Sequence, residues 1–476
     1  MEKHVLSKST FIRGAQCLKS LYLNKKRPFL RDRLSDAQRA VFKRGTDVGI
    51  LAQQLFPEGT NLKPRSPALY RKKVMETQNI LQSERKKTLY EAAFQYNQLL
   101  VLLDILVKNH NSTKAYEVKS SLKISDTFLL DAAFQYYVIT RSGVSLDDFF
   151  LVTLNPDYVL SDTLDIQQLF CIKSVLNEVK ERQPWIEKQI EKEKEALQAT
   201  SSPKIPIGTH CHKPYACDFI GHCWKKVPDN SLLYLDAFEP EIRFKKYYDR
   251  EDLPEKMETT GLNSLQKVQL LSAKNRKLVA DRNKITGFIG SFSLPPLFLS
   301  VFFIRPAVPF VNGSRPYEHL PLAALVEDPL LKEKKVTFFT DSDNPIISFE
   351  KYLTRLTAYN RTILVYDQSE IRAFLDEQKS IELSEKLKLS DLQHLFKTGI
   401  LFHYLFRGDY SARQAARIIL HEEKPDLDPS LLSMHWQRRL FEQKSIDEKL
   451  KTGAEIFLRE MYQFTFDLFN YLKNKN

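Results

Sequence analysis

Two acidic residues and a lysine lie on neighbouring apolar segments of the chain. Asp104 interrupts the apolar run Leu100–Leu106, where a lone carboxylate is costly unless it is paired or binds a metal. Glu117 and Lys119 follow in the sequence Tyr-Glu-Val-Lys, and a spacing of two places them on one face of a strand. An Asn-rich turn over 108–113 that pairs the two strands would bring Asp104 beside them.

Two carboxylates with a lysine beside them are suited to metal-assisted hydrolysis of a phosphodiester bond. Hard oxygen ligands favour Mg²⁺ or Mn²⁺, so Asp104 and Glu117 are the predicted metal ligands. A bound ion polarises the phosphate and lowers the pKa of the attacking water. Lys119 would orient that water or stabilise the developing charge. The alternative is a structural cross-strand ion pair, which an isolated Glu-x-Lys tripeptide usually forms.

Three cysteines with equal spacing form a second group of chemical interest. Cys211, Cys217 and Cys223 follow a C-x5-C-x5-C pattern, and a fourth cysteine, Cys17, lies far upstream. Four thiolates suit a [4Fe–4S] cluster, and the histidines within the same segment also suit zinc. Buried free cysteines are the third interpretation. The fifth cysteine, Cys171, is expected on the core face of a helix.

The elements that position these residues alternate between helices and strands. Helical character is expected over 12–56, 65–98, 125–141 and 165–200, with Glu91 in the second of these helical stretches. Strands are expected over 99–107, 114–119 and 148–154. A helical connector over 228–284 leads to a second region with strands over 297–304 and 362–366 and then helices. This order predicts an α/β protein.

An uncharged stretch over 285–304 is long enough to cross a bilayer, but it contains Pro295-Pro296. A Pro-Pro pair is poor for a lipid-exposed helix, so two buried strands or a strand and a loop are expected. Residues 1–10 are polar, and five cysteines in 476 residues do not suggest a disulfide scaffold. The sequence therefore predicts a cytoplasmic protein without a membrane partner.

The positive charge of the chain is confined to its first fifth. The formal net charge is +12, and residues 1–100 hold 20 Lys and Arg against 8 Asp and Glu, which accounts for all of it. Clusters of this kind are often solvated helix faces, but together they favour an acidic partner such as DNA. The predicted nucleic-acid contacts are Lys25, Lys26, Arg27 and Arg44, and binding by them would depend strongly on salt.

The order of these elements and motifs resembles the PD-(D/E)xK nucleases. The stretch from Asp131 to Tyr136 (Asp-Ala-Ala-Phe-Gln-Tyr) resembles the motif of their RecB-like branch, in which a glutamine on this helix lines the active site. The resemblance implies that Gln135 positions DNA or water, with Glu91 and Tyr136 as helpers. Two departures are Ile139, where a tyrosine is usual, and Gly49, where many members have a metal-binding histidine. The resemblance implies a metal-dependent DNA exonuclease.

The cysteines resemble those of the iron–sulfur RecB-like exonucleases, which include AddB-type and CRISPR-associated enzymes. This implies that Cys17, Cys211, Cys217 and Cys223 hold a structural [4Fe–4S] cluster that ties the two ends of the domain together. The spacing of five between the last three cysteines departs from the AddB-type pattern and leaves zinc as the alternative. The implied partners are DNA and a helicase or a repair, defence or CRISPR protein.

The second α/β region resembles a bacterial family in which such a nuclease is joined to a ribonuclease-H-like, DEDD-type exonuclease domain. Ser300 and Phe302 stand where that family has two metal-binding acids, and Phe466 stands where it has an aspartate. Neutral side chains cannot hold two Mg²⁺ ions. The motif that follows Tyr366 keeps acids at Asp367 and Glu370.

The sequence thus predicts a PD-(D/E)xK restriction-endonuclease-like domain with helical insertions over 1–228 and a helical connector over 229–285. A degenerate ribonuclease-H-like α/β domain follows over 286–476. The alternatives are a non-catalytic nucleic-acid-binding or scaffold protein that keeps a nuclease fold, and a zinc-binding regulatory protein.

Overall fold

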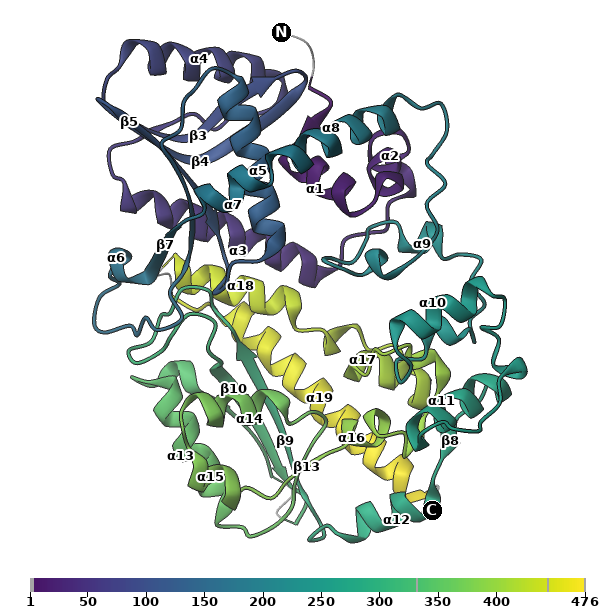
Figure 1. Ribbon diagram of the computed structural model, residues 1–476. Coiled ribbons are helices and arrows are strands. Elements are labelled where there is room, and N and C mark those ends of the chain that lie inside the picture. Colours follow the sequence, from purple (N-terminus) through teal and green to yellow (C-terminus); the bar gives the residue numbers. More distant parts are fainter. Residues whose placement is uncertain (1–3, 331–332, 443–444, 475–476) are drawn as a thin grey trace. The chain divides into compact units, whose positions relative to one another are not determined.

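The computed structural model describes residues 4–330, 333–442 and 445–474 of the chain. It divides into two compact units, Met1–Lys225 and Lys226–Asn476 (Figure 1). Each unit combines a mixed sheet with packed helices, so the α/β class is confirmed. Residues 229–285, expected as a connector, lie within the second unit.

The first unit is built on a seven-stranded sheet with the order β2-β3-β4-β5-β6-β7 and with β1 beside β4. The strands β3, β4 and β5 pair in antiparallel fashion, β6 is parallel to β5, and β7 is antiparallel to β6. Their bounds are β1 (Leu6–Ser7), β2 (Thr60–Asn61), β3 (Lys87–Tyr96), β4 (Leu99–Asn109), β5 (Ser112–Lys119), β6 (Asp148–Leu154) and β7 (Phe170–Ser174).

Helices cover this sheet, and α5 makes the crossover between the parallel strands β5 and β6 (Figure 1). Its apolar face buries Ala132, Phe134 and Val138 in the core, and Ser125 caps its N-terminus. The bounds are α1 (Lys8–Gln16), α2 (Leu18–Lys26), α3 (Asp36–Ala52), α4 (Tyr70–Ser83), α5 (Asp126–Arg141), α6 (Ile166–Leu169), α7 (Leu176–Glu181), α8 (Gln183–Gln198) and α9 (Ile220–Cys223).

The predicted strands and the crossover helix of the first unit are confirmed, but the prediction for 65–98 is wrong in its second half. Helix α4 ends at Ser83, and 87–96 forms the strand β3. The run Leu89–Phe94 has buried side chains on both faces of the sheet, so its apolar residues do not alternate. The same stretch was compatible with a buried helix.

Two other segments also differ from the prediction. Residues 170–174, expected to be helical, form the edge strand β7, and Cys171 is exposed there rather than buried in a core. The uncharged stretch from Ile285 begins within the helix α12 (Arg282–Gly290), and only β9 (Leu297–Ile304) is a strand. Ile285 and Ile289 are buried one turn apart, which is a helical spacing that the uncharged composition obscured.

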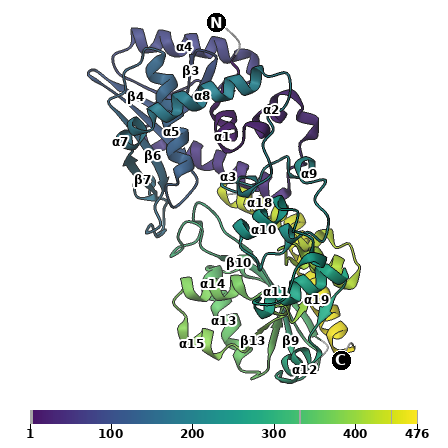
Figure 2. The same cartoon turned by 45° about the vertical axis from the view of Figure 1, so that its right-hand side comes forward.

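The second unit has a five-stranded sheet with the order β11-β10-β9-β12-β13. The expected strands at 297–304 and 362–366 are confirmed as β9 and β12 (Ile363–Val365), and the long helix α19 (Glu448–Asn474) packs against β9 (Figure 2). The strands β10 (Leu320–Asp328) and β11 (Glu333–Phe338) lie in a stretch for which no element was predicted. The short strands β13 (Leu389–Asp391) and β14 (Leu401–Phe402) lie where only helices were expected, and β14 pairs with β8 (Val279–Ala280) of the expected helical connector. Other helices of this unit include α14 (Ser369–Glu377) and α18 (Ser430–Phe441).

No helix in the described ranges combines the length and the apolar character needed to cross a bilayer.

Candidate active site

The predicted catalytic side chains meet across the paired strands β4 and β5. The hairpin pairs Ile105 with Tyr116, so Asp104 and Glu117 are the next residues along the two strands, as the turn between the strands predicted. Asp104 Oδ2 accepts a hydrogen bond from the backbone N–H of Val118 at 2.8 Å. Lys119 Nζ lies 2.8 Å from Glu117 Oε1, so these two side chains share one face of β5.

A second lysine, Lys8, also lies in this site. Its Nζ atom is 2.7 Å from Glu117 Oε1, the same oxygen that contacts Lys119. The parallel pairing of β1 with β4 brings the N-terminal segment to the site, and α1 begins there at Lys8 after a capping box formed by Ser7 and Thr10. Lys8 and Glu117 are 109 residues apart, so no local spacing could have signalled this contact.

Helix α5 adds a third acid and the predicted glutamine. Asp131 accepts a hydrogen bond from Lys119 Nζ, and Gln135 Nε2 lies 3.5 Å from Asp131 Oδ1. Asp131 is 6% exposed and Gln135 is fully buried. Phe134 stacks on Phe11 of α1 with ring centroids 4.3 Å apart, which fixes α1 and α5 together beside the site.

Burial and neighbouring charges shift the pKa values of the two predicted metal ligands, Asp104 and Glu117, in opposite directions. Burial raises the pKa of Asp104 to about 7, and the neighbouring charge of Glu117 adds to this shift. Burial acts in the same direction on Glu117, but Lys119 and Lys8 outweigh it and lower its pKa to about 2. The same attractions keep both lysines charged, since they raise each lysine pKa against the opposing effect of burial.

The donor set fits a divalent cation that carries water molecules. Glu117 is 1% exposed, and its Oε2 atom accepts no hydrogen bond from any residue within the described ranges. Such an orphaned oxygen next to Asp104 is an available ligand position. Mg²⁺ needs only one or two protein carboxylates, because water and phosphate complete its coordination. In the described part of the chain, no three Asp, Glu, His or Cys side chains are grouped for direct ligation of one ion.

The two predicted helper residues lie in different surroundings. Glu91 lies on β3 and not on a helix. The pairing of β3 with β4 skips it, and its backbone φ of +55° departs from the strand conformation. Its carboxylate pairs with Lys63 at 3.1 Å near the surface. Tyr136 lies on α5 next to Gln135 and is half-buried against the core.

The four predicted cluster cysteines line one cavity. Cys17, at the junction of α1 and α2, lines this cavity together with Cys211, Cys217 and Cys223. Burial raises the pKa of the Cys17 thiol, and the nearby Cys217 and Cys211 raise it further. The structure therefore brings together thiols that lie some two hundred residues apart in the sequence. Each iron of a [4Fe–4S] cluster takes one thiolate, so four thiols around one cavity fit such a cluster, although among the described residues no three of them are grouped to ligate a single ion.

Hydrogen bonds tie the N-terminal helices to the cysteine segment around this cavity. Gln16 Nε2 donates to the backbone oxygens of His210 and Tyr215, both at 2.7 Å. Arg13 Nη2 pairs with Asp218 at 2.7 Å. Helix α1 thus begins at Lys8 in the carboxylate site and ends beside the cysteine cavity.

The predicted nucleic-acid contacts lie at the end of α2. Lys25 and Lys26 form its last turn, Arg27 follows it, and all three side chains are exposed. Cations at a helix C-terminus are favourable to the helix itself, so their position alone does not assign a ligand. Arg44 lies in α3, and its side chain is outside the part of the structure that is described.

In the second unit, the positions expected to carry metal-binding acids belong to the core. Phe302 is 1% exposed and packs against Trp436 and Phe457, with ring centroids 6.3 and 5.6 Å away. Ser300 is buried on the same strand, β9. Phe466 of α19 lies 5.4 Å from the ring of Phe298.

Comparison with known proteins adds no family assignment. No protein-family model matches the chain, and no curated protein matches it.

Proposed function

We propose that the protein is a metal-dependent nuclease that hydrolyses phosphodiester bonds of DNA, as an exonuclease of the PD-(D/E)xK type. One observation carries this proposal: Asp104, Glu117 and Lys119 converge on adjacent strands, with Asp131 and Gln135 of the next helix beside them. The cluster is buried and holds an orphaned carboxylate oxygen. Replacing a buried ion pair by apolar residues is often neutral or stabilising, so stability alone does not account for this cluster.

Asp104 and Glu117 would hold Mg²⁺ or Mn²⁺, which when bound polarises the phosphate and activates water. Lys119 remains charged beside Glu117 and would orient the attacking water or stabilise negative charge on the phosphate. Lys8 supplies a second cation on the same oxygen and would bind the scissile phosphate once Glu117 ligates the ion. Gln135 holds Asp131 and has a buried Oε1 atom without a partner in the described residues, which fits a role in positioning water.

We further propose that Cys17, Cys211, Cys217 and Cys223 hold a structural [4Fe–4S] cluster, with zinc as the alternative. The four thiols line one cavity, and the segments that carry them are joined by direct hydrogen bonds. Such a group would fix the N-terminal helices to the last part of the first unit. Iron and zinc analysis of the anaerobically purified protein distinguishes the two, since a cluster gives about four irons per chain.

The second unit is proposed to be a ribonuclease-H-like domain without exonuclease activity of its own. Phe302 fills the expected metal position with aromatic packing, and Ser300 offers no carboxylate. This unit would then serve as a binding or partner surface, in which a helicase or a repair, defence or CRISPR protein is the expected class of partner. Substitution of Asp367 or Glu370 should leave cleavage unchanged.

One observation favours a second candidate function, a nucleic-acid-binding or scaffold protein without catalysis. Lys8 and Lys119 together neutralise much of the charge of Glu117 and Asp131 without any metal ion. A cluster that is balanced in this way is also a plausible core ion network. The two candidates differ in whether a divalent ion displaces these lysine contacts.

The proposal is tested by incubating the purified chain with labelled single-stranded DNA, duplex DNA and RNA, each with Mg²⁺, Mn²⁺ or EDTA. Metal-dependent cleavage of DNA is expected, and Asp104→Asn should abolish it. Tyr359→Ala, a change at an exposed residue of the second unit, is the matched control and should cleave normally. Equal cleavage by Asp104→Asn would place the activity elsewhere and favour the scaffold candidate.

A further inference from the structure

Two aromatic side chains of the first unit are exposed to solvent on segments next to the cysteine cavity. Phe29 is 80% exposed and Tyr215 is 52% exposed. Burying a phenylalanine side chain contributes about 1.5–3 kcal/mol, and Phe29 gives up most of that gain. Neither ring is therefore explained by packing of the core.

The two rings belong to segments that are hydrogen-bonded to each other. Phe29 is the centre of the 3₁₀ turn η1 (Pro28–Leu30), and the backbone N–H of Asp32 donates to the carbonyl oxygen of Asp218 at 2.7 Å. Phe29 is three residues from Asp32, and Tyr215 is three residues from Asp218. A chain extends at most about 3.6 Å per residue, so the two Cα atoms are within about 30 Å of each other. A few nucleotides of extended strand cover that distance.

The conformation of this surface is fixed before any ligand arrives. The N–H of Arg31 donates to the Pro28 oxygen at 3.1 Å and closes η1, with the proline at its first position. Arg31 also pairs with Asp218 at 2.5 Å. The Tyr215 backbone is held by Gln16 through the 2.7 Å bond to its carbonyl oxygen. Rings on a rigid backbone lose little entropy on binding.

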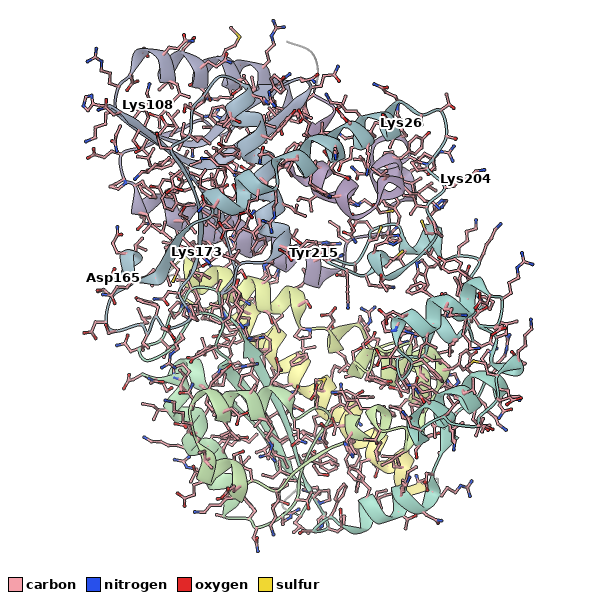
Figure 3. All side chains as sticks on the ribbon, viewed as in Figure 1. Lys26, Lys108, Asp165, Lys173, Lys204 and Tyr215 are labelled. Carbon is pink, nitrogen blue, oxygen red and sulfur yellow. The ribbon has the colours of Figure 1, made fainter. Side chains whose placement is uncertain are left out.

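Exposed cations lie close to each ring along the sequence. Lys26 and Arg27 immediately precede η1, and Lys213 lies two residues before Tyr215. Lys204 adds a further exposed cation in the segment that α2 holds through the bond from Tyr22 Oη to the Thr200 oxygen at 3.1 Å. Figure 3 labels Lys26, Lys204 and Tyr215. Flat apolar rings interleaved with cations match a ligand that carries both stacking faces and negative charges.

We propose that Phe29 and Tyr215, with Lys26, Arg27 and Lys213, form a stacking platform that binds single-stranded nucleic acid. Unpaired bases stack on the two rings, and the cations contact the phosphates between them. A duplex covers the faces of its bases by its own stacking, so the platform selects single strands. This inference rests on the proposed nuclease function, because it identifies the bound strand as the substrate of that site.

The test is fluorescence anisotropy of the full-length chain with labelled oligonucleotides of about 16 nucleotides in EDTA, which allows binding without cleavage. Single-stranded DNA, single-stranded RNA of the same sequence and duplex DNA are compared. Phe29→Ala and Tyr215→Ala should each weaken single-strand binding about tenfold, whereas duplex binding should change by less than about twofold. Phe29→Trp should restore affinity, because the tryptophan keeps a stacking face.

Tyr359→Ala removes an aromatic side chain that is 46% exposed in the second unit, and it should bind like the wild type. Thermal melting should be the same for Phe29→Ala and the wild type, since an exposed ring adds little stability. Aromatic dependence with either DNA or RNA supports the platform and identifies which strand it takes.

The platform is refuted if both alanine variants bind single strands as tightly as the wild type, or if duplex binding falls equally. Aromatic-dependent binding without any metal-dependent cleavage would refute the nuclease proposal and leave the platform standing. Normal metal-dependent cleavage with binding that does not depend on the two rings would refute the platform and leave the nuclease proposal standing.

Discussion

Replacement of Lys8 gives the sharpest prediction about the site, because it should lower the stability of the metal-free protein but strengthen the binding of Mn²⁺. Lys8→Met removes one of the two cations on Glu117 Oε1 and leaves Lys119 in place at 2.8 Å. The loss of one hydrogen bond to a buried charged group costs about 1.5–3 kcal/mol. The first unit has 225 residues, for which 1 kcal/mol corresponds to about 2–4 °C, so its metal-free melting temperature should fall by about 3–12 °C.

The same change should strengthen the binding of Mn²⁺, because Lys8 competes with the ion for Glu117. Cleavage should nevertheless be slower by about 10²-fold, since a cation aimed at the phosphate is lost. Isothermal titration with Mn²⁺, thermal melting with and without the ion, and single-turnover cleavage measure the three effects. Addition of Mn²⁺ should recover part of the lost stability, because the ion supplies the missing positive charge.

Lys63→Met is the matched control, since Lys63 also pairs with a glutamate but its side chain is 56% exposed. An exposed pair contributes about 0–1 kcal/mol, so melting, metal binding and cleavage should all stay near the wild-type values. The reasoning about Lys8 is refuted if Lys8→Met melts and cleaves like the wild type. A loss of Mn²⁺ affinity in that variant would also contradict it, because Lys8 would then support the ion rather than compete with it.

Three further predictions concern other parts of the chain. Burial raises the pKa of Glu193 from 4.5 to about 9, so stability should fall as the pH rises through that window, by up to about 4 kcal/mol from pH 5 to 8. Glu193→Gln keeps the shape, and its melting temperature should lose this pH-dependent difference, whereas the same slope in both proteins would contradict the assignment. Cys17→Ser should lose most bound iron and lower the melting temperature, whereas Cys171→Ser, at an exposed residue of β7, should retain both. Phe302→Asp should destabilise the second unit in thermal melting by at least about 3–5 kcal/mol without creating metal-dependent cleavage, because it removes a ring that is buried among aromatic residues and buries an unpaired carboxyl group.

The part of the site that the sequence predicted is local. Asp104, Glu117 and Lys119 belong to one hairpin with a tight turn, and Gln135 belongs to the helix that follows it directly. Their spacing and the alternation of the strands were sufficient to predict that these side chains lie together, because strands that are neighbours in sequence usually pair.

Lys8 depends on long-range contacts. It reaches Glu117 only because β1 adds to β4 from the start of the chain. The cysteine cavity also depends on long-range contacts, and there the resemblance to a known arrangement supplied the link that spacing could not. The strand β3 was mistaken for a helix because both of its faces are buried, so the period of its apolar residues carried no signal.

Single-turnover cleavage by Glu117→Gln tests the central claim most directly. Both lysines contact Oε1 of Glu117, and its Oε2 is the orphaned oxygen. The substitution removes the charge of this side chain but keeps its shape. Glu193→Gln is the matched control, because it makes the same substitution at another buried glutamate outside the site. With saturating Mn²⁺ and labelled single-stranded DNA, we predict that Glu117→Gln cleaves at least about 10³-fold more slowly than the wild type, whereas Glu193→Gln cleaves normally. Equal cleavage by Glu117→Gln and the wild type would contradict the account.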